Sequence, residues 1–206
     1  MKTIFIPLAI ISFASCGGGE AETTTPTGSV EVCNYSYDSS STILTWTAFK
    51  LTEKIGVNGT FDEINVVAND NATDMFGVLT GATFDIPVAT LNSQDPIRDP
   101  TVKRAFFGNM VETASIKGSV ISLNATQANM SITMNGVTKE YSGVVKVDGE
   151  KITVTTTIDI VDFEAQLSLD SLSVTCSEKH TGPDGVNKFW STVDVAVQTT
   201  LIKTCK

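Results

Sequence analysis

Groups that catalysis requires are scarce in this sequence. It contains a single histidine, His180, in a polar loop with no second histidine or cysteine at metal-ligand spacing, and this residue is interpreted as a surface histidine without a role. No G-x-S-x-G, P-loop or H-E-x-x-H motif occurs, and the adjacent carboxylates Asp62 and Glu63 are typical of a solvated turn. The sequence therefore predicts that the protein is not an enzyme and holds neither a metal nor a catalytic cofactor.

Positive charge is also scarce, because 14 lysines and arginines are outnumbered by 23 acidic residues and the net charge is −9. A nucleic-acid-binding protein needs a basic surface that replaces counterions, so nucleic acid is excluded as a partner. The same charge disfavours docking onto anionic lipid headgroups. Attachment to a membrane would therefore have to come from a covalent lipid.

Long apolar runs are absent except at the start of the chain. Lys2 precedes an apolar run of about ten residues, shorter than the ~20 that a transmembrane helix needs, and small residues lead from it to Cys16. This order predicts a secretory signal peptide over residues 1–15. The segment Ala14-Ser15-Cys16 resembles the bacterial lipobox, although Phe13 replaces the commoner leucine. We therefore predict a lipoprotein that is cut before Cys16 and anchored by lipid on that cysteine; the alternative is an ordinary signal peptide that ends near a cysteine.

The next segment, residues 16–29, contains the lipidated cysteine and a predicted flexible tether. Three glycines are followed there by Glu, Ala, Thr and Pro without apolar periodicity. Residues 30–206 are long enough for one domain with a sizeable core. The predicted location is the bacterial cell envelope, lipid-anchored and periplasmic or associated with the outer membrane. The oligomeric state is not indicated by the sequence.

Alternation of apolar and polar residues with a period of two dominates the domain, which predicts an all-β fold. Asn135-Gly136 and Asp148-Gly149 are dipeptides preferred in type I′ hairpin turns, so consecutive strands form an antiparallel meander. Seven or eight long strands need protected edges, and closure into a barrel provides them. Such a barrel is either filled by side chains or holds one small ligand, and composition leaves both open. The alternating segments are residues 82–88, 128–134, 152–160 and 189–201, and residues 137–147 are the return strand of the first hairpin.

Two short helices are predicted to interrupt the meander. Asp99 is the expected N-cap of the first, with Pro100 at its first position and Gly108 beyond its end. Asp162 is the expected cap of the second. Its buried side would carry Phe163, Leu167 and Leu172.

Three blocks of sequence resemble the YceI-like family. The first is Thr-Trp-Thr-Ala-Phe-Lys at residues 45–50 with Lys-Ile-Gly-Val-Asn-Gly-Thr-Phe at residues 54–61. The second is the strand at residues 84–91, followed by Arg98-Asp99 and a double phenylalanine at residues 106–107. The third is Ile-Thr-Met-Asn-Gly-Val-Thr-Lys at residues 132–139. The resemblance covers residues 35 to 202. It departs from the family between residues 107 and 116, which lack the usual proline and aromatic pattern, and between 163 and 188, which are longer and more polar.

The resemblance implies a closed eight-stranded antiparallel, lipocalin-like barrel with two short helices. It also implies an elongated apolar cavity for a polyisoprenoid or a similar amphipathic lipid, bound without a cofactor. The expected function is to sequester or carry such a lipid in the cell envelope. Two alternatives are a non-catalytic envelope stress or interaction module that uses the barrel only as a scaffold, and an enzyme acting on an envelope lipid.

Large apolar residues on the predicted strands and helices are the candidate ligand contacts, with ordinary core packing as the alternative for each. Met130 and Met134 favour the cavity because flexible thioethers suit irregular apolar walls. Arg98 either contacts a pyrophosphate or quinone head or forms a structural pair with Asp99 at the start of the helix. The predicted ligand-binding residues are Trp46, Phe49, Phe61, Phe84, Phe106, Met130, Ile132, Met134, Phe163, Leu167 and Trp190.

One disulfide is predicted among the remaining cysteines. Cys33 precedes the first predicted strand and Cys205 follows the last, and these two strands are neighbours in a closed antiparallel barrel. With Cys16 carrying lipid, a Cys33–Cys205 bond would leave Cys176 as a free thiol.

Overall fold

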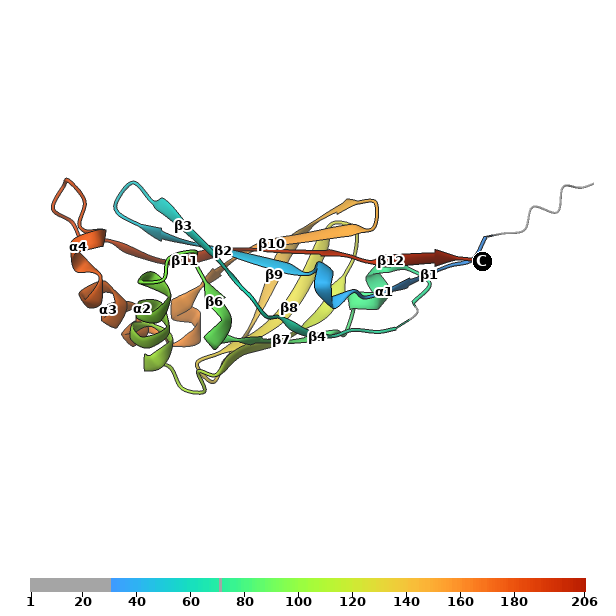
Figure 1. Cartoon of the computed structure of the whole chain (residues 1–206), viewed down its shortest axis with the longest axis horizontal. Helices are drawn as coiled ribbons and strands as arrows, with labels where there is room; N and C mark the ends of the chain where they lie inside the picture. The colour runs from blue at the N-terminus through green and yellow to red at the C-terminus, as the bar shows by residue number, and fades with distance from the viewer. Residues whose placement is uncertain (1–30, 71) are drawn as a thin grey trace, which may run out of the picture. The chain divides into compact units, whose positions relative to one another are not determined.

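Ten strands form one antiparallel sheet in the order β4-β5-β7-β8-β9-β10-β11-β2-β3-β6. The computed structural model describes residues 31–70 and 72–206 (Figure 1). The predicted signal peptide, Cys16 and the tether lie outside the described residues. The strands of this sheet are β2 (Ile43–Lys50), β3 (Ile55–Phe61), β4 (Asn65–Val67), β5 (Thr83–Pro87), β6 (Leu91–Asn92), β7 (Ser115–Leu123), β8 (Gln127–Met134), β9 (Val137–Asp148), β10 (Lys151–Asp159) and β11 (Phe189–Thr200).

Short helices and a second, two-stranded ribbon complete the domain. The ribbon pairs β1 (Cys33–Ser36) with β12 (Ile202–Cys205). The helices are α1 (Met75–Leu79), α2 (Arg98–Ala105), α3 (Gln166–Thr175) and α4 (Ser177–His180), with 3-10 turns η1 (Ser39–Ser41), η2 (Val88–Thr90), η3 (Phe107–Asn109) and η4 (Ile160–Phe163). Figure 1 shows α2, α3 and α4 gathered at one end of the sheet and α1 beside the ribbon at the other. None of the helices within the described residues is long and apolar enough to cross a membrane.

The two predicted hairpin turns differ in type. Asn135 and Gly136 both have positive φ, 54° and 71°, as a type I′ turn between β8 and β9 requires. Strand β9 continues through Asp148, which pairs with Lys151, so the second turn consists of Gly149 and Glu150. Only Gly149 has positive φ there, at 60°, which is typical of type II′. The predicted turn at Asp148-Gly149 is therefore one residue too early.

The sheet curls, and its two end strands, β4 and β6, are short. Only three residues separate β4 from β3, and the 3-10 turn η2 separates β6 from β5. Phe61 of β3 pairs with Leu91 of β6, while Val66 of β4 pairs with Phe84 of β5. The turn η2 therefore splits the predicted strand at residues 84–91 in two. The structure thus shows a curled ten-stranded sheet, and the predicted closed eight-stranded barrel is not confirmed as such.

Helix α2 begins at Arg98, two residues before the predicted first position, Pro100. Its cap is Asp95, whose carboxylate accepts hydrogen bonds from the backbone N–H groups of Ile97 and Arg98 at 2.9 and 3.0 Å. Asp99 instead accepts hydrogen bonds from the backbone N–H and the hydroxyl of Ser93. The predicted cap is therefore wrong. Asp95 accepts the hydrogen bonds of the free N–H groups, and Asp99 instead connects the helix to Ser93, just after β6.

The second predicted helix is broken into three pieces, η4, α3 and α4. Glu164 has a φ of 55° and ends η4, which shifts the helical phase before α3 begins. Asp162 lies inside η4, where its carboxylate accepts a hydrogen bond from the hydroxyl of Tyr141 at 2.7 Å. It is therefore not a helix cap. Leu169 and Leu172, rather than Leu167, face the interior from α3.

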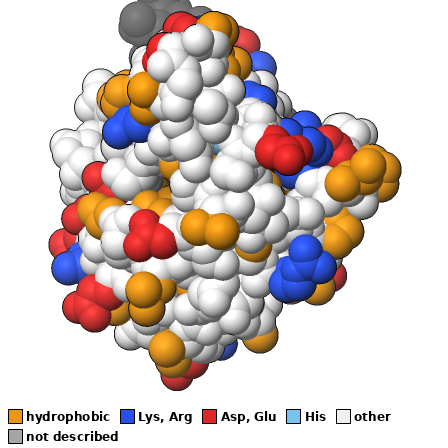
Figure 2. All heavy atoms as spheres, turned by 90° about the vertical axis from the view of Figure 1, so that its left-hand side faces the viewer, with side chains coloured by type: hydrophobic (Ala, Val, Ile, Leu, Met, Phe, Trp, Pro, Cys, Tyr) orange, Lys and Arg blue, Asp and Glu red, His pale blue; other side chains and the backbone are white. Residues whose placement is uncertain are grey.

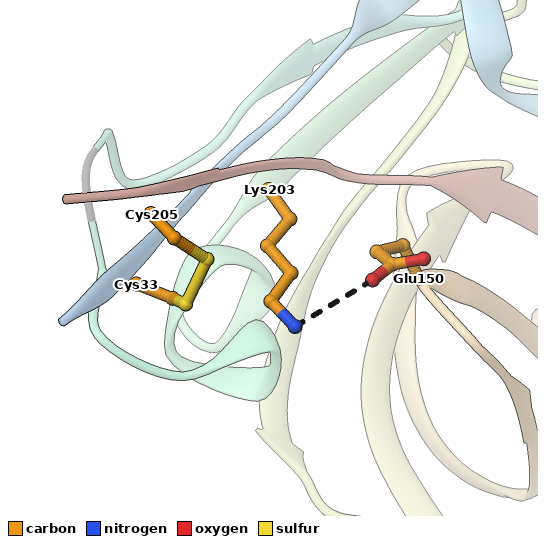
Figure 3. The surroundings of a disulfide bond; sticks show 4 residues. All are labelled: Cys33, Glu150, Lys203 and Cys205. Carbon is orange, nitrogen blue, oxygen red and sulfur yellow. Dashed lines mark ion pairs between the residues drawn. A yellow bond between two sulfur atoms is a disulfide. The ribbon is translucent and has the colours of Figure 1, made fainter. Parts of the chain in front are cut away.

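The β1–β12 ribbon is closed by a disulfide between Cys33 and Cys205, the pairing predicted from the sequence (Figure 3). These two cysteines are directly paired across the ribbon and are 172 residues apart in the chain. Lys203 of β12 lies 4.0 Å from Glu150 in the adjacent hairpin turn. Among the described residues, Cys176 is the free cysteine.

Candidate functional site

A cavity of about 410 Å³ lies inside the curled sheet. Alternate residues of β2, β8, β10 and β11 line it, as the pleat of a β-strand requires. Leu44, Trp46 and Ala48 of β2 face the cavity, as do Val195 and Val197 of β11. The residues between them on these strands do not, so the cavity wall is the inner face of the sheet.

Nine of the eleven predicted ligand contacts lie in the cavity wall. These are Trp46, Phe49, Phe61, Phe84, Phe106, Met130, Ile132, Met134 and Trp190. The other two do not line it. Phe163 is completely buried in the core beneath the helices, where its ring stacks on Tyr141 at 5.8 Å between centroids. Leu167 is 76% exposed, because the phase change at Glu164 turns it to the outside of α3.

Two aromatic rings of the wall lie over glycines of neighbouring strands. Trp46 is paired with Gly59 and Phe84 with Gly118. A Cβ atom at either glycine would overlap the ring opposite it, so only glycine admits these rings against the wall. The Trp46 indole also donates its N–H to the carbonyl of Thr60 at 3.3 Å. The wall is therefore shaped by large rings with fixed positions.

The end of the cavity nearest α1 is closed by buried side chains. Leu79, Ala128 and Ile152 line it, with exposed fractions of 9% or less. The hydroxyl groups at this end bond to one another, because the Thr42 hydroxyl lies 2.8 Å from those of both Tyr37 and Thr199. This end thus presents an apolar surface with its polar groups already satisfied.

The opposite end of the cavity is charged and reaches the surface between β2, α2 and α4. Every charged side chain in the wall lies here: Lys50, Asp95, Arg98 and Lys179. The Arg98 guanidinium is 3.1 Å from the Asp95 carboxylate, and the Lys50 ammonium donates to the carbonyl of Lys179 at 3.4 Å. Figure 2 views the molecule from this side, where charged and hydrophobic side chains are exposed together. We refer to these four residues and His180 as the mouth.

The structure corrects the interpretation of His180 as a surface residue. Its ring lies in the mouth and stacks on Phe189, with ring centroids 3.9 Å apart and planes 2° from parallel. Burial first, and then the nearby charges of Lys50, Arg98 and Lys179, lower the pKa of His180 to about 4. The imidazole is therefore neutral at neutral pH. Its Nδ1 atom is buried and has no hydrogen-bond partner within the described residues.

Cys176 also lines the cavity close to the mouth. Burial raises the pKa of its thiol, with a smaller opposing effect from Lys179. A group of possible metal ligands in the described residues is Glu31 with Cys33 and Cys205. Both sulfurs belong to the disulfide, so they offer no thiolate to a metal ion.

Comparison with known proteins gives one family and several related folds. The sequence pattern of the YceI-like domain matches residues 35–201. The structure resembles a polyisoprenoid binding domain from Saccharophagus degradans implicated in plant cell wall breakdown, with a TM-score of 0.57 and 14% identity over 82% of this chain and 97% of that one. It also resembles Burkholderia cenocepacia BcnA, with a TM-score of 0.52 and 12% identity over 82% and 99% of the two chains.

A third similar structure is the Campylobacter jejuni YCEI protein, with a TM-score of 0.50 and 14% identity over 76% of this chain and 89% of that one. No curated protein sequence matches the chain. At these identities the likeness to solved structures establishes the lipocalin-like fold. The match to the domain's sequence pattern is stronger evidence of relationship than the structural likeness, because it covers most of the chain.

Proposed function

The chain belongs to the YceI-like domain family, and from that premise we propose that it binds one amphipathic lipid of the polyisoprenoid type in its cavity and sequesters or carries it in the bacterial cell envelope. The observation that carries the proposal is the cavity itself, which is apolar along its length and charged only at the mouth. An uncharged chain gains about 0.8 kcal/mol for each CH₂ removed from water, so such a wall favours a long hydrocarbon. The Saccharophagus degradans relative, described as polyisoprenoid binding, supports the same class of ligand.

The proposal includes a wall that closes around the lipid. The two end strands of the sheet, β4 and β6, belong to two continuous segments of the chain, since β4 follows β3 and β6 follows β5. The two segments pair with each other at both ends: β3 pairs with β6, and β4 pairs with β5. The backbone N–H of Asp62 also donates to the carbonyl of Thr90 at 2.9 Å between these two pairings. Hydrogen bonds along this seam support closure of the sheet as a barrel.

The cavity favours binding over the two alternative functions. A barrel used only as a scaffold would be filled by its own side chains, whereas this one contains space. An enzyme acting on the lipid would need a general acid or base beside it. His180, with its pKa lowered to about 4, is a weak base, and burial raises the pKa of the Cys176 thiol. The one carboxylate of the cavity wall, Asp95, is occupied by Arg98 and by the N-terminus of α2.

Binding of a prenyl chain is the first prediction. We expect geranylgeraniol to displace the fluorescent apolar probe N-phenyl-1-naphthylamine from the full chain carrying Cys16→Ser, with one lipid bound per protein. Farnesol, shorter by one isoprene unit, is expected to bind at least ~10-fold more weakly, because it buries fewer carbons. The bound lipid should also slow alkylation of the Cys176 thiol, which lines the cavity. The absence of both displacement and protection would overturn the proposal.

A lipid anchor on Cys16 is the second prediction, supported by the signal-like segment before that residue. In bacteria fed an alkyne-tagged fatty acid, we expect the full chain to become labelled and to sediment with membranes. Cys16→Ser should abolish both results, whereas Cys176→Ser should change neither. Label retained by the Cys16→Ser variant would contradict the assignment of the anchor.

A further inference from the structure

We propose that the mouth binds an acidic head group, so that the lipid held in the cavity carries a phosphate or another anion in contact with Lys50, Arg98, Lys179 and His180. This inference rests on the proposed function for the hydrocarbon chain and adds the chemistry of the other end of the ligand. It assigns a direction to the lipid: the tail points toward α1 and the head lies among α2, α4 and β2.

The sign of the local charge is the first argument. The whole chain carries a net charge of −9, yet three of the four charged side chains in the cavity wall are cations. The single acid among them, Asp95, is paired with Arg98. Three positive charges converge from separate elements at one end of the cavity, and each attracts an anion. The mouth is therefore a local positive site on an acidic protein.

Unused hydrogen-bond donors are the second argument. Among the described residues, the Arg98 side chain donates to Asp95 through one nitrogen, Nη2, and a guanidinium has five N–H donors. The Lys50 ammonium donates one long hydrogen bond, 3.4 Å, to a backbone carbonyl. Phosphate and carboxylate oxygens are the natural acceptors for such groups. At the α1 end of the cavity, by contrast, the hydroxyl groups already satisfy one another.

The position of His180 is the third argument. Stacking on Phe189 fixes the plane of its ring, and the buried Nδ1 atom has no partner in the described part of the chain. The ring lines the cavity beside the cations of the mouth. An anion bound there would favour the protonated imidazole, which would add a further positive charge to the site.

Proton uptake follows from the same contacts. The groups around His180 are Lys50 on β2, Asp95 and Arg98 at α2, and Cys176 and Lys179 at α4; the Lys188 ammonium, also close in the chain, lies over Trp190. These cations and burial keep the free imidazole neutral, with a pKa of about 4. A bound anion raises that pKa. Affinity should therefore increase as the pH falls through the pKa of the bound state, and level off near the pKa of the free state.

The test compares two lipids with the same chain, geranylgeranyl phosphate and geranylgeraniol, by probe displacement from the full chain carrying Cys16→Ser. At pH 7 we expect the phosphate to bind at least ~10-fold more tightly. Lys179→Gln and Arg98→Gln should each reduce that preference several-fold, because each removes one cation of the mouth. Lys146→Gln, on an exposed residue of β9, is the matched control and should leave both affinities unchanged. Inorganic phosphate at the same concentration should displace no probe.

Each outcome separates the two proposals. Equal affinities for both lipids would overturn the anionic head group and leave chain binding intact, whereas binding of neither lipid would overturn both. Displacement by inorganic phosphate would show a site for the free ion rather than for a lipid head. For His180, the ratio of wild-type to His180→Gln affinity for geranylgeranyl phosphate should rise at least ~3-fold between pH 8 and pH 5.5, since the ligand's own titration cancels in this ratio. A constant ratio would remove His180 from the site.

Discussion

Replacing Ala48 by tryptophan is expected to weaken the binding of geranylgeraniol about 100-fold. Ala48 lies on β2 with its side chain in the cavity wall, between Val57 on one neighbouring strand and Val193 on the other. An indole there would occupy space that the lipid chain needs. If it excludes about four carbons at ~0.8 kcal/mol each, the loss is ~3 kcal/mol, which corresponds to about 100-fold in affinity.

The matched control is Ala196→Trp on the adjacent strand β11. Ala196 lies between Val195 and Val197, which line the cavity, so its own side chain is on the outer face of the same sheet. This variant should bind geranylgeraniol within about 2-fold of the wild type. Circular dichroism and thermal unfolding of both variants would establish that each retains the fold. Unchanged binding by folded Ala48→Trp would show that the lipid does not lie in this cavity.

The wall of the cavity could be predicted well because strand periodicity is a local property of the sequence. Phe84 and Met130 belong to segments that alternate strictly, and both face the cavity. Gly59 and Gly118 leave room for the rings of Trp46 and Phe84. The sequence does not reveal these contacts, because it does not show which strands are neighbours. Register, set by the hairpin turns, converts alternation into an inner and an outer face. Val195 and Val197 were not predicted as cavity residues, because the register of β11 with its neighbours was not known from the sequence.

The mouth could not be predicted, because its charges converge only in the folded chain. Lys50 ends a strand, Arg98 begins α2, and Lys179 and His180 lie on α4. Helix α4 is within residues 163–188, a stretch that departs from the family pattern. No spacing within the sequence links these positions. The isolated histidine was informative only once its ring was found among three cations. Phe163 and Leu167 were misplaced for a related reason, since a single left-handed residue, Glu164, reset the helical phase.

Removing the disulfide is expected to lower the free energy of unfolding by ~3–5 kcal/mol, because the crosslink restricts a very long loop in the unfolded chain. Cys33 and Cys205 are 172 residues apart, so the bond joins almost the two limits of the folded domain. The measurement is urea denaturation of Cys33→Ser/Cys205→Ser in the Cys16→Ser background, against that background alone. Cys176→Ser is the control and should shift the free energy of unfolding by less than ~0.5 kcal/mol.

The same variant should leave lipid binding almost unchanged while the protein is folded. The disulfide closes the β1–β12 ribbon, which lies beside α1 (Figure 1), whereas the mouth lies among α2, α4 and β2. In the variant we expect the ribbon to keep its strand pairing and the backbone hydrogen bonds between Val32 and Lys206. Removing the disulfide then mainly increases the conformational entropy of the unfolded chain. An affinity for geranylgeraniol within about 2-fold of the parent would fit this separation. A loss of stability below ~1 kcal/mol would instead show that these strand contacts alone hold the ribbon in place.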